Sequence, residues 1–322
     1  MDFAEIKGQD KAIGQLEKYS FAKRMASSYL FTGPEAVGKK LTALSWAKQL
    51  NCQAPNPQAC GLCGSCIKID KLVHPDVHLF TSEENDQLES VKIEDIRLLQ
   101  KEINLKAYEG NYKVFIIDNA HNLTLEAGNA LLKVLEEPPD KSLIILITHK
   151  PSFMLKTIVS RCRVVKFFPL KRDFLSAQLE ESYFLNKEKA HFLSYFSEGR
   201  IGLALRIKDS NILEKKNMIF EDFFASGKAV TEKTYALDKN EMYLILNVLS
   251  LWLRDLYLLK TAGTSCRVIN LDYRDKLIAL SKKYTIANLE AFLKEIMDAL
   301  NYTKQNVNPR LLFSHLQHVL KG

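Results

Sequence analysis

Apolar residues follow two different spacings in the first half of the chain, and these spacings predict alternating strands and helices. Short continuous apolar runs predict buried strands at residues 28–32, 77–80, 114–118 and 143–148. Apolar residues three or four positions apart predict helices at residues 10–24, 39–50, 91–105 and 125–135. Strands that alternate with helices are typical of a doubly wound α/β domain with a parallel sheet.

The second half of the chain lacks strand patterns and is predicted to be helical. Residues 170–207 have the pattern of a small helical unit, which we expect Gly199 and Gly202 to interrupt. Long amphipathic stretches then predict helices at residues 241–260, 286–302 and 311–320. We therefore expect three domains, at residues 1–167, 168–207 and 208–322.

Composition places the chain among ordinary globular proteins. Hydrophobic residues make up 47% of its 322 residues and charged residues 26%, which is typical of an ordinary soluble protein. The N-terminal residues lack the pattern of a signal peptide, and no run of about 18 apolar residues predicts a membrane span. These observations favour the cytoplasm. The net charge of +7 is compatible with nucleic acid or acidic partners, and equally with a mildly basic protein that has neither.

A glycine loop connects the first predicted strand to the helix that follows it. Residues 33–40 read Gly-Pro-Glu-Ala-Val-Gly-Lys-Lys and match the phosphate-loop pattern G-x-x-x-x-G-K-[ST] except at the last position. In such a loop the backbone N–H groups and the Lys bind phosphate, and the final hydroxyl binds Mg²⁺. Gly33, Gly38 and Lys39 are retained, so nucleotide binding stays open. Lys40 replaces the hydroxyl and supplies no oxygen for a metal.

A second catalytic position is altered at the end of a predicted strand. Asp118 closes the apolar run 114–118, where ATPases of this type carry an acid that is followed by a Glu. That Glu polarises the attacking water, whereas Asn119 occupies the position here and cannot act as a base. Two independent losses predict the fold of an ATPase without its activity.

Four of the six cysteines are clustered after the glycine-loop helix, and Cys162 and Cys266 stand apart. The cluster comprises Cys52, Cys60, Cys63 and Cys66. Four thiolates in a compact loop suit tetrahedral Zn²⁺, and a site with four protein ligands is structural rather than catalytic. Free reduced cysteines and an iron–sulfur cluster are the alternatives.

Three histidines near these motifs are not needed as metal ligands. Four cysteines already complete a tetrahedral site, so the histidines are expected to be satisfied or exposed side chains. They are His74, His78 and His121.

Several motifs together resemble bacterial clamp-loader subunits of the AAA+ class. They are the altered phosphate loop, the four cysteines after its helix, Asn-Ala-Leu-Leu-Lys-Val-Leu-Glu-Glu-Pro-Pro at residues 129–139, and Ser160-Arg161-Cys162. The resemblance covers the first 207 residues through motifs and the rest through architecture. It implies an AAA+ parallel-sheet domain, a small helical lid and a C-terminal all-α collar that holds subunits together.

The resemblance also implies roles for individual residues. Arg161 matches the arginine finger, which is donated to ATP bound in a neighbouring subunit and can raise the rate by about 10³–10⁵. Thr148 falls at the sensor-1 position, and Gly202 stands where active members carry a sensor-2 Arg. With Lys40 and Asn119, Gly202 favours a subunit that does not hydrolyse ATP over one of the gamma/tau type.

The same resemblance implies the partners. They would be gamma/tau and delta clamp-loader subunits, the sliding clamp and primer–template DNA, within the replicative polymerase holoenzyme. An active ATPase subunit of the gamma/tau type remains the alternative, as does a zinc-dependent nucleic-acid-binding module with a vestigial ATPase fold.

Overall fold

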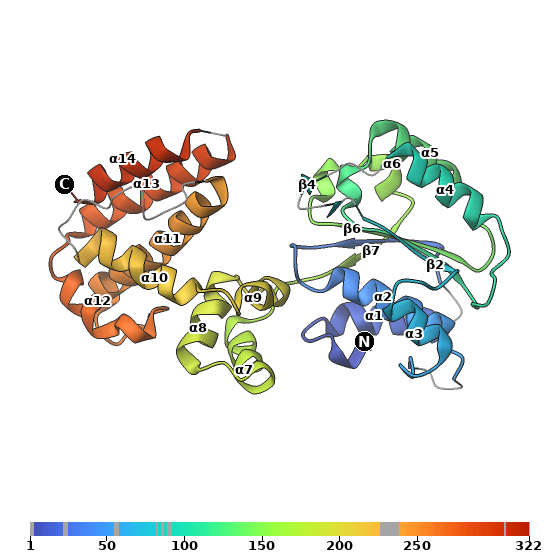
Figure 1. Ribbon diagram of the computed structural model, residues 1–322, viewed down its shortest axis with the longest axis horizontal. Helices are drawn as coiled ribbons and strands as arrows, with labels where there is room; N and C mark the ends of the chain where they lie inside the picture. Colours follow the sequence, from blue (N-terminus) through green and yellow to red (C-terminus); the bar gives the residue numbers. More distant parts are fainter. Residues whose placement is uncertain are drawn as a thin grey trace. The chain divides into compact units, whose positions relative to one another are not determined.

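The computed structural model describes residues 3–21, 25–54, 58–81, 83–84, 87–88, 92–225, 238–305 and 307–321. The chain divides into two compact units, residues 1–170 and residues 171–322 (Figure 1). The first unit combines a sheet with helices, and the described residues of the second unit are helical or lie in loops.

The sheet of the first unit has five parallel strands. Their order across the sheet is β2 (Val77–Phe80), β5 (Lys113–Ile117), β6 (Ser142–Thr148), β1 (Ser28–Thr32) and β7 (Arg163–Lys166). A separate antiparallel pair joins the two-residue strands β3 (Glu83–Glu84) and β4 (Gln87–Leu88). Because the five strands run the same way, their carboxyl ends meet at one edge, where ligands bind in open α/β sheets.

Helices cover both faces of the sheet. One face packs against α1 (Asp10–Phe21), α2 (Lys39–Asn51) and α3 (Gly64–Asp70), and the other against α4 (Ile93–Ile103), α5 (Leu125–Glu136) and α6 (Lys156–Val159) (Figure 1). Successive strand residues point to opposite faces. In β1 this sends Tyr29 and Phe31 toward Trp46 of α2, and Leu30 into the opposite core. The α/β fold and the parallel sheet predicted from the sequence are confirmed.

The predicted strands and helices of this unit are present, and several short elements were missed. The predicted first helix is described only to Phe21, and residues 22–24 lie outside the described residues, as does Val91 at the start of another. The missed elements include α3, α6, β7 and the two-residue strands β3 and β4. Strand β7 lies at the edge of the sheet and buries only Val165, so it has no continuous apolar run to detect.

The second unit contains eight described α-helices. They are α7 (Arg172–Tyr183), α8 (Lys187–Phe196), α9 (Ile201–Ile207), α10 (Ile212–Phe220), α11 (Lys239–Ala262), α12 (Arg274–Ser281), α13 (Ile286–Lys304) and α14 (Pro309–Lys321). One π-helical turn, Glu221–Ala225, follows α10. Gly199 ends the preceding turn with a φ of 80°, whereas Gly202 lies inside α9, so the predicted interruption at Gly202 is wrong.

Helix α11 forms the centre of the second hydrophobic core. Its residues Met242, Leu249, Trp252 and Leu256 have no exposed surface and pack among α10, α12, α13 and α14. Among the described residues, α11 alone is long and apolar enough to cross a membrane by length and composition. Its buried residues account for that apolar character, because a helix at the centre of a bundle buries most of its sides.

Candidate functional site

The glycine loop lies between β1 and α2 at the carboxyl edge of the sheet. Gly33 and Gly38 have φ values of 143° and 98°, a region that glycine adopts without steric cost. A Cβ atom on Gly33 would lie 2.3 Å from the backbone oxygen of Phe167, so no side chain fits there. The two glycines therefore set the shape of the loop that leads into α2.

Lys39 at the start of α2 is buried and faces its own loop. Its Nζ donates hydrogen bonds to the backbone oxygens of Gly33 at 2.7 Å and Pro34 at 2.5 Å. Burial lowers the pKa of Lys39 to about 8, and the nearby carboxylates of Asp118 and Glu35 oppose that shift. The ammonium group is thus held in place by loop carbonyls, and two nearby acids favour its charged form.

Lys40, the residue that replaces the metal-binding hydroxyl, points toward the acid at the end of β5. Its Nζ lies 3.6 Å from Oδ2 of Asp118. The other carboxylate oxygen of Asp118, Oδ1, accepts a hydrogen bond from the backbone N–H of Asn119 at 3.0 Å. Asn119 itself adopts a left-handed conformation with a φ of 52°. A cationic side chain of the protein itself therefore lies beside the carboxylate that would face Mg²⁺ in an active site of this type.

Two histidines border the same edge of the sheet. Thr148, the last residue of β6, lies with its Oγ1 3.2 Å from Nδ1 of His121. The rings of His121 and His149 stand edge to face with centroids 4.3 Å apart. Nε2 of His149 lies 3.0 Å from Oε1 of Glu35, which belongs to the glycine loop. These contacts connect the loop to the end of β6.

His121 should remain neutral at physiological pH. Burial lowers its pKa to about 4, helped by the neighbouring His149 and Lys150. Below pH about 6.5 the unfolded chain takes up a proton that the folded site accepts only near pH 4, so protonation in this range works against folding. NMR titration of the histidine Cε1–H signals should show this low pKa for the signal that disappears in His121→Gln. A pKa near 6.5 for that signal would contradict the buried environment.

The residues predicted to form a nucleotide site all lie along this edge. They are Gly33, Gly38, Lys39, Asp118 and Thr148. The sequence prediction missed Glu35 and His149, because a surface Glu in a loop and a His after a strand carry no signal until the register of the sheet is known. The roles of all these residues toward nucleotide stay predictions.

Arg161, the predicted arginine finger, follows α6 and makes no described contact with the glycine loop. Its Nη2 donates to Oε1 of Glu136 at 2.6 Å, and its Nη1 donates to the backbone oxygen of Thr157 at 3.0 Å. About a third of its side chain is exposed, at 35%. The guanidinium is therefore anchored on one side and accessible on the other.

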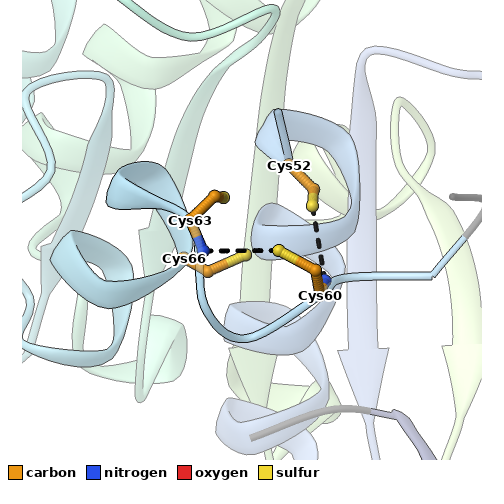
Figure 2. Close-up of side chains that lie close together, drawn as sticks. All are labelled: Cys52, Cys60, Cys63 and Cys66. Atoms are coloured by element: carbon orange, nitrogen blue, oxygen red, sulfur yellow. Dashed lines mark hydrogen bonds between the residues drawn. The ribbon is translucent and has the colours of Figure 1, made fainter. Parts of the chain in front are cut away.

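The four clustered cysteines converge on one point (Figure 2). Cys52 directly follows α2, Cys60 lies in the loop, and Cys63 and Cys66 lie at the start of α3. All four Sγ atoms are within 4.8 Å of one another. The backbone N–H groups of Cys60 and Cys63 donate to the sulfurs of Cys52 and Cys60, each at 3.3 Å (Figure 2).

The donor set of this cluster fits a zinc ion. Tetrahedral zinc with Zn–S bonds of about 2.3 Å needs sulfurs about 3.8 Å apart, which the 4.8 Å limit on the separations here allows. Burial raises the pKa of the Cys66 thiol to about 12. Burial acts the same way on Cys63, but hydrogen bonds from the backbone of Gln53 and Cys66 outweigh it and lower the pKa of that thiol to about 6. A bound cation would favour the thiolate at every position.

His74 connects the cysteine cluster to the body of the domain without belonging to it. Its Nε2 lies 2.9 Å from Oγ of Ser65, which sits between two of the cysteines, and its Nδ1 accepts the backbone N–H of Asp76 at 3.1 Å. The carboxylate of Asp76 in turn accepts three backbone N–H groups from residues 108–110. Within the described residues the cluster contains four cysteines and no histidine. His74 and His121 each have a hydrogen-bond partner, as expected, whereas Nε2 of His78 is buried without one, contrary to the prediction.

Comparison with known proteins places both units in one family. The family model for the DNA polymerase III delta subunit matches residues 8–171, just over half of the chain. The model for the C-terminal part of the same subunit matches residues 216–318. The delta' subunit of DNA polymerase III from Bacillus subtilis is 29% identical over 90% of this chain and 83% of its own length.

One further similarity covers part of the chain, and another covers most of it at low identity. The tau subunit of DNA polymerase III from Bacillus subtilis is 35% identical over 51% of this chain, which spans only 29% of that longer protein. A DNA polymerase III gamma subunit-related protein from Thermotoga maritima has a TM-score of 0.48 at 19% identity, over 96% of this chain and 98% of that one. The clamp-loader resemblance seen in the sequence is confirmed by the two family models, and the chain belongs to the DNA polymerase III delta subunit family.

Proposed function

We propose that this chain is a clamp-loader subunit that does not hydrolyse ATP itself and acts as a stator. It would donate Arg161 to ATP bound by a neighbouring gamma/tau subunit and help to load the sliding clamp onto primed DNA during replication. The 29% identity with a delta' subunit along most of the chain supports this type of subunit.

The observation that carries the non-hydrolysing role is the pair of Lys40 and Asp118. In an active phosphate loop, a hydroxyl and a carboxylate hold Mg²⁺ beside the β- and γ-phosphates. Here an ammonium group stands 3.6 Å from the carboxylate, and the hydroxyl is missing. The residues present do not fit a magnesium ion, since a cation next to the carboxylate of Asp118 repels a second cation. Asn119 also provides no base for the attacking water.

The position of Arg161 supports action on another subunit. The described hydrogen bonds of its guanidinium are with Glu136 and Thr157, and part of the side chain is open to solvent. A guanidinium offers several N–H donors in a planar fork that matches phosphate oxygens. Such a group, free of its own glycine loop, suits donation to a nucleotide held by a neighbour.

We further propose that the cysteine cluster holds a structural zinc ion through Cys52, Cys60, Cys63 and Cys66. The convergence of four thiols and the absence of a fifth donor among the described residues support a closed site. When bound, the metal would replace internal packing in a segment that is too short to form a core of its own.

The three-domain organisation is also part of the proposal. Residues 1–167 would form the AAA+ domain, residues 168–207 the lid and residues 208–322 the collar that joins the subunits. Gamma/tau and delta subunits, the sliding clamp and primer–template DNA would be the partners, in the cytoplasm. The buried apolar residues of α11 would stabilise the collar.

An active ATPase of the gamma/tau type is the second candidate. The 35% identity with a tau subunit over half of the chain favours it. ATP hydrolysis by the isolated chain distinguishes the two candidates. An active subunit would carry all the catalytic residues except the arginine finger and so would hydrolyse ATP by itself.

We expect the isolated chain to release phosphate from ATP no faster than its Lys39→Ala variant, with Mg²⁺ in excess. Lys40 blocks the metal position and Asn119 cannot activate water, so both proteins should show background rates. Phosphate release over hours, with circular dichroism to verify folding, measures this. Hydrolysis that Lys39→Ala abolishes would support the gamma/tau alternative instead.

A further inference from the structure

The contact between Arg161 and Glu136 joins two motifs that lie apart in the sequence. Arg161 Nη2 donates to Glu136 Oε1 at 2.6 Å, a short charge-assisted hydrogen bond, and Nη1 donates to the backbone oxygen of Thr157 at 3.0 Å. The two acceptors hold different nitrogens of the guanidinium. They therefore fix both the position and the plane of the group.

Glu136 is poorly placed for the stability of its own helix. It is the last residue of α5, where the helix dipole is negative and a carboxylate is unfavourable. The next residue, Glu137, is also exposed and forms no ion pair with a described residue. Arg161 supplies the opposite charge only at Glu136. An acid at the C-terminus of a helix breaks a common sequence preference. Such an exception, when a residue of another element compensates it, commonly marks a functional position.

The geometry leaves Arg161 able to bind an anion. A guanidinium has five N–H bonds, and the contacts with Glu136 and Thr157 use two of them. The side chains of Arg161 and Glu136 are 35% and 51% exposed, so the contact orients the guanidinium without burying it. The remaining N–H groups stay available for a phosphate.

We infer that Glu136 is a positioning residue for Arg161, whose guanidinium it orients for a nucleotide phosphate on the neighbouring subunit. This inference rests on the proposed role of Arg161 as the arginine finger. A long side chain that is already oriented loses less conformational entropy when it binds phosphate, so more of the interaction free energy contributes to binding. Glu136 itself touches no reacting atom.

Reconstituted loader with gamma/tau, delta, clamp and primed DNA tests the inference through steady-state ATP hydrolysis. Glu136→Ala should lower kcat about fivefold, equivalent to about 1 kcal/mol, with little change in the KM for ATP. Glu136→Gln keeps an acceptor oxygen and should recover most of the rate. Glu137→Ala, the adjacent acidic control, should leave the rate unchanged.

The double variant separates positioning from general stability. If Glu136 acts through Arg161, Arg161→Ala combined with Glu136→Ala should be no slower than Arg161→Ala alone. Additive losses, an unchanged rate in Glu136→Ala, or a faster rate from release of a masked finger would each overturn the inference. Size-exclusion chromatography must show intact loader for every variant.

The proposed function and the inference fail in different ways. If Arg161→Ala leaves ATP hydrolysis unchanged in an intact loader, the finger role itself is wrong, and the role of Glu136 falls with it. If Arg161→Ala lowers the rate and Glu136→Ala does not, the finger stands and only the positioning role is lost.

Discussion

Replacing Arg161 with Ala in a reconstituted clamp loader should lower the clamp- and DNA-stimulated rate of ATP hydrolysis at least about tenfold, or ~1.4 kcal/mol. A guanidinium at the γ-phosphate offsets the charge that develops in the transition state, and an Arg supplied by a neighbour is worth about 10³–10⁵ at one site. We expect less in the whole loader than at a single site, because ATP sites that Arg161 does not reach would keep their rate.

Two further variants make this result specific to the finger. Arg161→Lys keeps the charge but loses the planar fork, so it should recover only part of the rate. Lys156→Ala removes an exposed cation from α6 and should leave the rate unchanged. An intact loader with an unchanged rate in Arg161→Ala would reduce this chain to a scaffold.

Loss of the cysteine cluster should have the second large effect, on metal content and on local order. The purified chain should contain one zinc ion, and Cys66→Ser should retain less than about a tenth of it, since structural zinc sites need all four ligands. Cys66 has no exposed surface, so the serine also leaves a polar group in a buried position. Metal analysis by mass spectrometry gives the stoichiometry.

The loss of local order in Cys66→Ser should extend beyond the cluster through the contacts of His74. Ser65 lies between Cys63 and Cys66 and contacts His74, which is tied in turn to Asp76. Limited proteolysis should therefore cut Cys66→Ser within residues 58–76, while the helices of the second unit resist.

Cys162→Ser provides the matched control for this experiment. Cys162 is also buried, with burial raising its pKa to about 12, but it lies outside the cluster. The Cys162→Ser variant should keep its zinc and should resist proteolysis at residues 58–76. A wild-type chain without zinc, or a Cys66→Ser variant that keeps it, would contradict the proposed metal site.

The sequence by itself determined the elements and the motifs. The spacing of apolar residues located most strands and helices because it records which side of each element is buried. It failed where little is buried, as in β7. The glycine loop and the cysteine spacing were also readable, because loop geometry and metal ligation impose residue types at short range. Arg161 was readable only through its motif, since a single exposed Arg has no pattern.

The tertiary structure decided which distant groups meet. Parallel pairing of β1 with β6 aligns Thr32 with Thr148 and so brings the end of β6 beside the glycine loop, where Glu35 reaches His149. The pairs of Lys40 with Asp118 and of Arg161 with Glu136 also join separate elements. Apolar runs of similar length can pair in several orders and registers, so strand patterns alone do not specify these contacts. The packing of helices on both faces of the sheet selects one strand order and register. These in turn determine which side chains meet at the carboxyl edge.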